Sequence, residues 1–109
     1  MIMKISCIIL TFNEELHIGR CISNVQRITS DICVVDSFST DKTSEIAKSF
    51  GARVIQHAWI NYSTQFNWAL TQLSPDTEWV LRIDADETLA ATLIEQINSR
   101  LPGLSSDIE

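Results

Sequence analysis

Two aspartates separated by one residue, Asp84 and Asp86, directly follow the apolar run Trp79–Ile83. A strand over 79–83 would present both carboxylates at its carboxyl end. Carboxylate oxygens suit Mg²⁺ or Mn²⁺, ions that keep several waters and share phosphate oxygens with a substrate. The same stretch could instead begin the last helix, where Asp86 and Glu87 would interact with the helix dipole. The spacing alone favours a metal site and a helix cap equally.

A third acid, Asp36, follows the apolar run Ile32–Val35, and polar residues continue to position 41. A carboxylate at the end of a strand can bind ribose hydroxyls or a base edge. Residues 39–41 (Ser-Thr-Asp) also have the composition of a helix N-cap. We therefore predict that Asp36 contacts a ligand and that residues 39–41 mainly cap the following helix.

The chain carries no other motif that predicts chemistry. It has no GxGxxG, no phosphate-binding P-loop, no HExxH and no nucleophile elbow. His17 and His57 lie far apart with no second ligand at metal-like spacing, so we expect both to be surface or packing residues. The three cysteines form no CxxC pair, and we expect buried thiols that act as small hydrophobes in a reducing compartment.

Four short apolar runs alternate with four stretches of helical periodicity, which are the elements that must position these side chains. The strands are expected at 5–10, 32–35, 53–57 and 79–83, and the helices around 18–25, 43–50, 66–73 and 90–97. This alternation predicts an α/β fold, a Rossmann-like parallel sheet of right-handed βαβ units with flanking helices. Ligands of such sheets gather beyond the carboxyl ends of the strands.

Composition and charge exclude several classes of protein. The chain has 109 residues, of which 45% are apolar, enough for one compact core. This apolar fraction excludes an intrinsically disordered chain. Its apolar runs are far shorter than the roughly 18 residues of a membrane span. The net charge of −6 falls entirely within residues 74–109, so there is no basic footprint for nucleic acid. We expect a cytoplasmic protein.

Three ordered segments carry a resemblance to a known family. They are Ile8–Glu15, Val34–Thr43 and Ile83–Glu87, and they resemble the inverting family-two glycosyltransferases with a GT-A fold. The middle segment, together with Gln65–Leu70, is most similar to the bacterial members that build the lipopolysaccharide core. The similarity runs from about Ile5 to Glu87.

The resemblance implies a role for each of the site residues. Thr11 and Phe12 would lie beside the nucleotide base, a uracil-like ring on which Phe12 could stack. Asp36 would contact base or ribose. Asp84 would reach toward the ribose and the metal, and Asp86 would hold a divalent cation, Mg or Mn, on the diphosphate of a UDP-sugar. That cation would stabilise the charge that develops on the leaving group.

Two positions depart from the family pattern. Ser37 stands where the family commonly has a second Asp, and Phe66 stands where relatives often carry a Lys or Arg that could meet the diphosphate. Phe66 also falls on an apolar helical stripe, which favours packing. Phosphate affinity is therefore expected to be reduced.

The family's second half supplies most of the acceptor site and an Asp or Glu as general base. We expect the general base outside this chain, and we interpret residues 1–104 as the nucleotide-sugar-binding half and 105–109 as a tail. The acceptor implied is a cell-envelope glycan or lipid-linked lipopolysaccharide core. Family members act at the inner face of the cytoplasmic membrane, which implies peripheral association, although no membrane-binding helix is evident.

Other interpretations remain open. Residues 84–88 (Asp-Ala-Asp-Glu-Thr) also satisfy the D-x-D-x-T pattern of haloacid-dehalogenase-like phosphatases, although that motif usually lies on the first strand. A non-catalytic remnant would bind nucleotide without transfer. A parallel sheet with uncovered faces or edges would favour self-association into a homo-oligomer.

Overall fold

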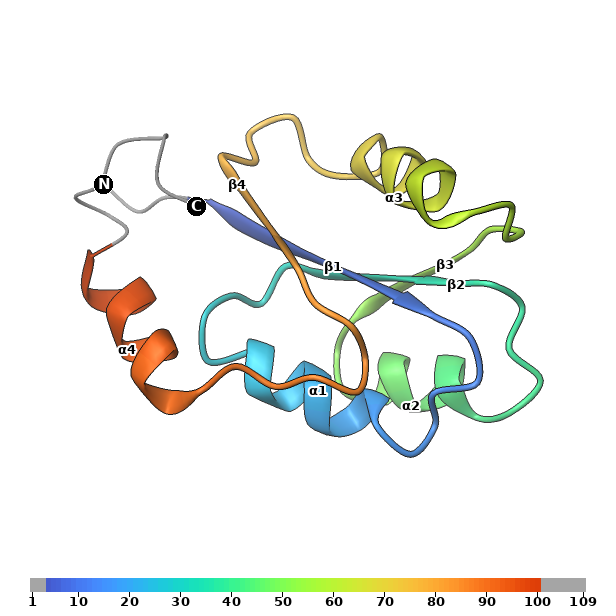
Figure 1. Cartoon of the computed structure of the whole chain (residues 1–109), viewed down its shortest axis with the longest axis horizontal. Coiled ribbons are helices and arrows are strands. Elements are labelled where there is room, and N and C mark those ends of the chain that lie inside the picture. The colour runs from blue at the N-terminus through green and yellow to red at the C-terminus, as the bar shows by residue number, and fades with distance from the viewer. Residues whose placement is uncertain (1–3, 101–109) are drawn as a thin grey trace.

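The chain alternates strand and helix from one end to the other (Figure 1). The computed structural model describes residues 4–100. The strands are β1 (Ile5–Thr11), β2 (Ile32–Asp36), β3 (Arg53–Gln56) and β4 (Trp79–Arg82), and the helices are α1 (Ile18–Val25), α2 (Thr43–Ser49), α3 (Tyr62–Leu70) and α4 (Ala91–Arg100). The strands form one sheet in the order β3-β2-β1-β4, with every pair parallel. The predicted α/β parallel sheet is confirmed.

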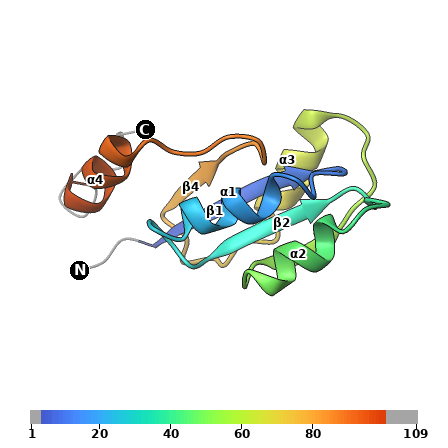
Figure 2. The same ribbon diagram turned by 90° about the horizontal axis from the view of Figure 1, so that it is seen from below.

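Helices cover both faces of the sheet. Helices α1 and α2 lie on one face and α3 on the other, while α4 lies at the end of the molecule where β1 begins (Figures 1 and 2). Alternate residues of β1 serve the two cores, because successive side chains of a strand point to opposite faces. Cys7 and Ile9 pack with α1 and α2, and Ile8 packs with Ala69 of α3.

The two central strands each run one residue further than expected, to Thr11 and Asp36. These two residues are partners in the parallel register of β1 and β2. Residues predicted to follow the strands therefore end them, side by side. By contrast, β3 and β4 stop one residue early, at Gln56 and Arg82.

The expected apolar stripe of α3 is partly wrong. The helix begins at Tyr62, because the Asn61 side chain accepts a hydrogen bond from the Thr64 N–H at 2.8 Å and caps it. It ends at Leu70, which is 38% exposed. The inward face carries Ala69 of the expected stripe, fully buried, with Phe66 packed against the same core, and it adds the fully buried Gln65. A buried glutamine is invisible to a hydrophobic pattern.

The last helix also departs from its expected stripe. Ile94 is buried, whereas Leu93 is 42% exposed. The dipeptide Pro102–Gly103, which is typical of a helix end, and the expected tail at 105–109 lie outside the described residues. Within residues 4–100, no helix combines the length and apolarity needed to cross a membrane.

All three cysteines are buried with free thiols, as predicted from their apolar surroundings. Burial raises the pKa of Cys7 to about 12 and that of Cys21 to about 11. Burial also raises the pKa of Cys33. Because the thiolate is the reactive form, these side chains act as core residues.

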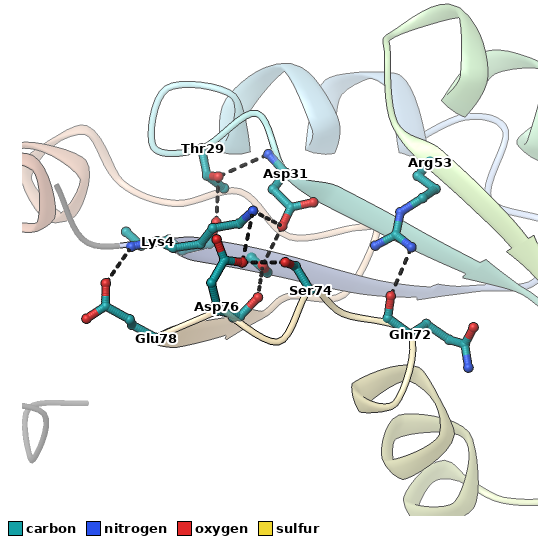
Figure 3. Close-up of polar contacts among 11 residues, drawn as sticks. Lys4, Thr29, Asp31, Arg53, Gln72, Ser74, Asp76 and Glu78 are labelled. Carbon is teal, nitrogen blue, oxygen red and sulfur yellow. Dashed lines mark hydrogen bonds and ion pairs between the residues drawn. The ribbon is translucent and has the colours of Figure 1, made fainter.

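Polar side chains pair with one another at the amino end of the sheet (Figure 3). The Lys4 ammonium lies 4.0 Å from the Asp31 carboxylate and 3.5 Å from that of Asp76. The buried Ser6 hydroxyl donates to Asp31, and the Thr29 hydroxyl donates to the Ile5 carbonyl at 2.7 Å. These contacts tie the segments before β2 and β4 to the start of β1.

Candidate functional site

A hollow of about 620 Å³ lies at the carboxyl end of the sheet. Residues at or after the ends of all four strands line it, namely Leu10, Thr11, Phe12, Glu14, Ser37, Trp59, Tyr62, Asp84, Ala85 and Asp86. This is the edge at which ligands of parallel sheets gather. Four of the five predicted site residues lie in its wall, and Asp36 does not.

The two aspartates after β4 are exposed and unpaired. The Asp84 N–H donates to the Glu87 carboxylate, and the Glu87 N–H donates to the Asp84 carbonyl, both at 2.9 Å. This turn uses Glu87 and leaves the other two carboxylates without a hydrogen bond or ion pair inside the described part of the chain. Helix α4 begins only at Ala91, with no acid in its first turn, so the helix-cap interpretation is wrong.

The donor set at this turn fits a shared metal site. Residues 4–98 contain no group of three or more His, Cys, Asp or Glu side chains that could hold a metal ion by themselves. Asp84 and Asp86 offer two carboxylates in the wall of an open hollow. Mg²⁺ in particular is typically bound by one or two carboxylates, with waters and substrate phosphates completing its shell. The residues present therefore suit a cation that arrives with a phosphorylated ligand.

Asp36 is fully buried and engaged by its neighbours. Its carboxylate accepts hydrogen bonds from the Thr11 hydroxyl at 2.7 Å, the Ser39 N–H at 2.9 Å and the Ser39 hydroxyl at 2.6 Å. Asp36 thereby fixes the position of Thr11, which does line the hollow. Its contact with a nucleotide stays a prediction.

The expected cap of α2 is only partly correct. Asp41 accepts from the Thr43 N–H at 2.9 Å and so satisfies the first turn of the helix. Ser39 instead binds Asp36 and accepts from the Asn13 N–H at 2.8 Å. Ser39 faces the strand ends rather than the helix because it completes the shell of the buried carboxylate.

Hydrogen bonds join the loops that follow β1 and β2. The Asn13 side-chain oxygen accepts from the Thr40 N–H at 2.9 Å, and the Glu14 N–H donates to the Thr43 hydroxyl at 2.8 Å. Asn13 has a φ of 52°, in the left-handed region that asparagine tolerates better than most residues. No local pattern predicts this link, which joins the segment of Phe12 and Glu14, beside the hollow, to the loop after β2.

A buried amide organises the loop after β3. Gln65 donates through Nε2 to the Ser37 hydroxyl and the His57 carbonyl, both at 3.1 Å. Its Oε1 therefore accepts from His57 Nδ1 at 2.7 Å. The His57 ring stacks on Trp68 at 3.9 Å between centroids, so His57 is a packing residue as predicted.

The other histidine lies at the surface. His17 Nδ1 is 3.7 Å from the Glu14 carboxylate, and its side chain is 42% exposed. It therefore also matches its prediction.

Aromatic rings form part of the apolar lining of the hollow. Phe12 is 58% exposed and Trp59 is 52% exposed, although both line it. The Trp59 ring meets that of Tyr62 edge-on, with centroids 6.4 Å apart. The sequence places Trp59 after the third strand, at the edge where ligands gather, but assigns a role to neither Trp59 nor Tyr62.

The comparisons with known proteins agree with this geometry. Residues 6–102 match the family described as Glycosyl transferase family 2. A protein of Rickettsia typhi named as an uncharacterized glycosyltransferase is 47% identical over 94 residues, which cover 86% of this chain and 32% of that protein. The lipopolysaccharide core biosynthesis glycosyltransferase LpsC of Rhizobium meliloti is 36% identical over 98 residues, covering 85% of this chain and 35% of LpsC.

Solved structures share the fold. TarS of S. aureus (residues 1–349) has a TM-score of 0.74 at 25% identity, over 89% of this chain and 32% of that chain. The mannosyltransferase PcManGT of Pyrobaculum calidifontis, solved with GDP-Man and Mn²⁺, has a TM-score of 0.73 at 24% identity, over 86% and 31%. This chain thus spans about a third of the length of the relatives it matches. With nearly its whole length matched, the chain belongs to glycosyl transferase family 2.

Proposed function

We propose that this chain binds a nucleoside-diphosphate sugar, specifically a UDP-sugar, together with Mg²⁺ or Mn²⁺ in the hollow at the carboxyl end of the sheet. One observation carries the proposal. Asp84 and Asp86 present unpaired carboxylates in the same hollow as Thr11 and Phe12. Membership of glycosyl transferase family 2 supports this assignment.

The chemistry of each side chain suits one part of such a donor. Phe12 offers an exposed ring on which a uracil base stacks, and Thr11 lies beside it. Asp36, predicted to contact base or ribose, holds the Thr11 hydroxyl at 2.7 Å. Asp84 would face the ribose and the cation of a bound donor, and Asp86 would hold the cation on its diphosphate.

The cation would supply electrostatic stabilisation of the departing nucleoside diphosphate. The chain's own part is to orient the donor and to hold its charged end next to Asp84 and Asp86. No described residue is assigned as general base. Transfer to an acceptor is proposed for the whole protein, of which relatives are about three times as long.

The names of the relatives support a proposal for the acceptor class. LpsC is named for lipopolysaccharide core biosynthesis, which supports a cell-envelope glycan or lipopolysaccharide core as acceptor. A lipid-linked acceptor at the inner face of the cytoplasmic membrane would require peripheral association there. The dehalogenase-like alternative is not proposed, because residues 6–102 match a glycosyltransferase family.

Calorimetric titration of the purified chain with UDP and with GDP tests this proposal. Each titration is run with Mn²⁺, with Mg²⁺ and with EDTA. We expect UDP to bind with a divalent cation and to lose most of its affinity in EDTA. Equal binding in EDTA would show that nucleotide binding does not need a metal. A preference for GDP would overturn the uridine assignment. Absence of binding in a cooperatively folded chain would contradict the proposal as a whole.

A non-catalytic nucleotide-binding protein is the second candidate. Three acids line the hollow, and none of them is a free candidate for a general base. Glu14 lies 3.7 Å from His17, and Asp84 and Asp86 are the two acids suited to a cation. This second candidate predicts UDP binding without UDP release from a UDP-sugar in the full-length protein with acceptor. Release of UDP with a glycosylated product would exclude it.

A further inference from the structure

The side chain of Arg82 lies on a pair of aromatic rings beside the hollow. Arg82 is the last residue of β4 and stands two positions before Asp84. Its guanidinium donates to the Tyr62 hydroxyl at 2.6 Å and lies 5.3 Å from the centre of the Tyr62 ring. The Phe66 ring centre is 6.0 Å away. These distances are within the range of cation–π attraction.

The two rings form a fixed platform for this cation. Tyr62 and Phe66 are four residues apart on α3, and their rings stack with an interplanar angle of 12°. Trp59 meets the edge of the Tyr62 ring. Tyr62 itself lines the hollow, so the platform connects Arg82 to the wall of the site.

A diphosphate bound in this hollow needs a positive side chain beside it, and Arg82 supplies one. The lining residues of the hollow include the carboxylates of Glu14, Asp84 and Asp86 but no Lys or Arg. A nucleoside diphosphate adds further negative charge, of which one divalent cation offsets a part. Among the Lys and Arg side chains of residues 4–98, that of Arg82 makes a hydrogen bond to a residue of the wall. Within the same range it makes no ion pair, so no carboxylate neutralises its charge.

The sequence of α3 points the same way. Helix α3 carries no Lys or Arg, and the Phe66 ring cannot bind phosphate. In the structure, the Arg82 guanidinium lies near that ring. Arg82 of β4 therefore places a positive charge next to the Phe66 ring, where α3 itself has none.

We propose that Arg82 binds the diphosphate of the donor and that Tyr62 and Phe66 are positioning residues for its guanidinium. This inference rests on the proposed function. One N–H of the guanidinium is used by the Tyr62 hydroxyl, and the others can pair with phosphate oxygens. Tyr62 keeps the planar group oriented, so that less side-chain freedom is lost when the phosphate binds.

The test compares ligands that differ only in phosphate. UDP and uridine are titrated with Mn²⁺ into the wild-type chain and into Arg82→Gln, with uridine measured by competition at millimolar concentration. We expect Arg82→Gln to weaken UDP binding about ten- to hundredfold and to leave uridine affinity unchanged. Arg82→Lys should restore part of the loss, because a point charge lacks the planar fork.

Two further variants separate positioning from packing. Tyr62→Phe keeps the ring and removes the hydroxyl, and we expect it to weaken UDP binding by less than Arg82→Gln. Arg53→Gln is the matched control, since the Arg53 guanidinium donates to the Gln72 carbonyl (Figure 3), and neither residue lines the hollow. It should leave UDP affinity unchanged. Urea unfolding of each variant reports whether the fold is retained.

The outcomes distinguish this inference from the proposed function. If the wild type binds UDP and Arg82→Gln binds it equally well, the role of Arg82 is overturned and the proposed function stands. An equal loss of UDP and uridine affinity would make Arg82 a packing residue that covers Tyr62 and Phe66. If the folded wild type does not bind UDP, both the inference and the proposed function are contradicted.

Discussion

Acidic side chains are paired at the amino end of the sheet, whereas two of those at its carboxyl end are unpaired in the described part of the chain. At the amino end, Asp31 and Asp76 share the Lys4 ammonium, and Asp31 also accepts from the buried Ser6 hydroxyl. At the carboxyl end, Asp84 and Asp86 have no such partners among the described residues and face an open hollow. The difference indicates that the partners of a carboxylate, rather than its residue type, separate a structural acid from one that we propose as a ligand-binding acid.

Asp36 differs from the other two acids at the carboxyl end. It ends β2 next to the hollow, yet it is fully buried and accepts three hydrogen bonds from Thr11 and Ser39. It is paired, as Asp31 and Asp76 are, but unlike them it is fully buried. Its main contribution should be to stability.

The largest effect on stability is expected for Asp36→Ala. The change leaves the Thr11 hydroxyl and two donors of Ser39 without their acceptor, and we expect a loss of about 3 kcal/mol in the free energy of unfolding. Asp86→Ala, at an exposed acid in the same region, should change it by less than about 0.5 kcal/mol. Urea denaturation measures both, and similar losses would contradict the distinction between paired and unpaired acids.

A smaller effect is expected at the amino end. Asp31→Ala removes the acceptor of the Ser6 hydroxyl and one partner of Lys4, at a cost of about 1–2 kcal/mol. Asp31→Asn keeps an acceptor oxygen and should cost less. Neither variant should alter UDP affinity, because this network lies at the other end of the strands. A change in affinity without unfolding would show that the two ends are coupled.

Asn13 tests the link between the two loops beside the hollow. Asn13→Gly loses the side-chain bond to the Thr40 N–H but accepts the φ of 52°. Asn13→Ala loses the bond and strains the backbone, so it should be less stable than the glycine variant by about 1 kcal/mol. Thermal unfolding of the pair measures this difference. Equal stability would indicate that the loop relaxes out of the left-handed region.

The smallest effect is a pH dependence at Asp76. A hydrogen bond from Ser74 lowers the pKa of its carboxyl below the ordinary value of 3.8; desolvation opposes this shift and Lys4 adds to it. Because the folded-state pKa is the lower one, the carboxylate stabilises the fold above about pH 3.8, and this contribution is lost as the pH falls through the lowered value.

Urea midpoints of wild type and Asp76→Asn measure this dependence. The wild type should be slightly more stable at pH 7, and the two midpoints should converge as the pH falls below the lowered pKa of Asp76. Asp84→Asn serves as the control, because the Asp84 carboxylate makes no hydrogen bond or ion pair in the described part of the chain. A difference for Asp76→Asn that persists unchanged at low pH would contradict the assignment.

The fold was largely predictable because it follows from patterns along the chain. Strand-length apolar runs such as residues 32–35 and helical stripes such as that of α1 depend on burial against a common core. The resemblance of three ordered segments then led to the right family. Element ends were harder, since the start of α3 depends on the side chain of Asn61 rather than on hydrophobicity.

The site was predictable only where a short motif marked it. Asp84 and Asp86 stand together in sequence, whereas the residues that hold the loops act across long separations. Gln65 binds His57 and Ser37 from a helix whose pattern suggested an apolar face. No local pattern predicts such bonds, because they depend on which loops the parallel sheet brings together.

Thermal unfolding with and without UDP and Mn²⁺ tests the role of the carboxyl end most directly. The wild-type chain is compared with an Asp84→Asn/Asp86→Asn double variant, and Glu95→Gln on α4 is the control for charge loss. UDP at 100 times its dissociation constant should stabilise the wild type by about 2.7 kcal/mol, a shift of roughly ten degrees or more at this size. We expect the double variant to lose the shift and Glu95→Gln to keep it. An equal shift in the double variant, or none in the folded wild type, would contradict a metal-dependent nucleotide site at Asp84 and Asp86.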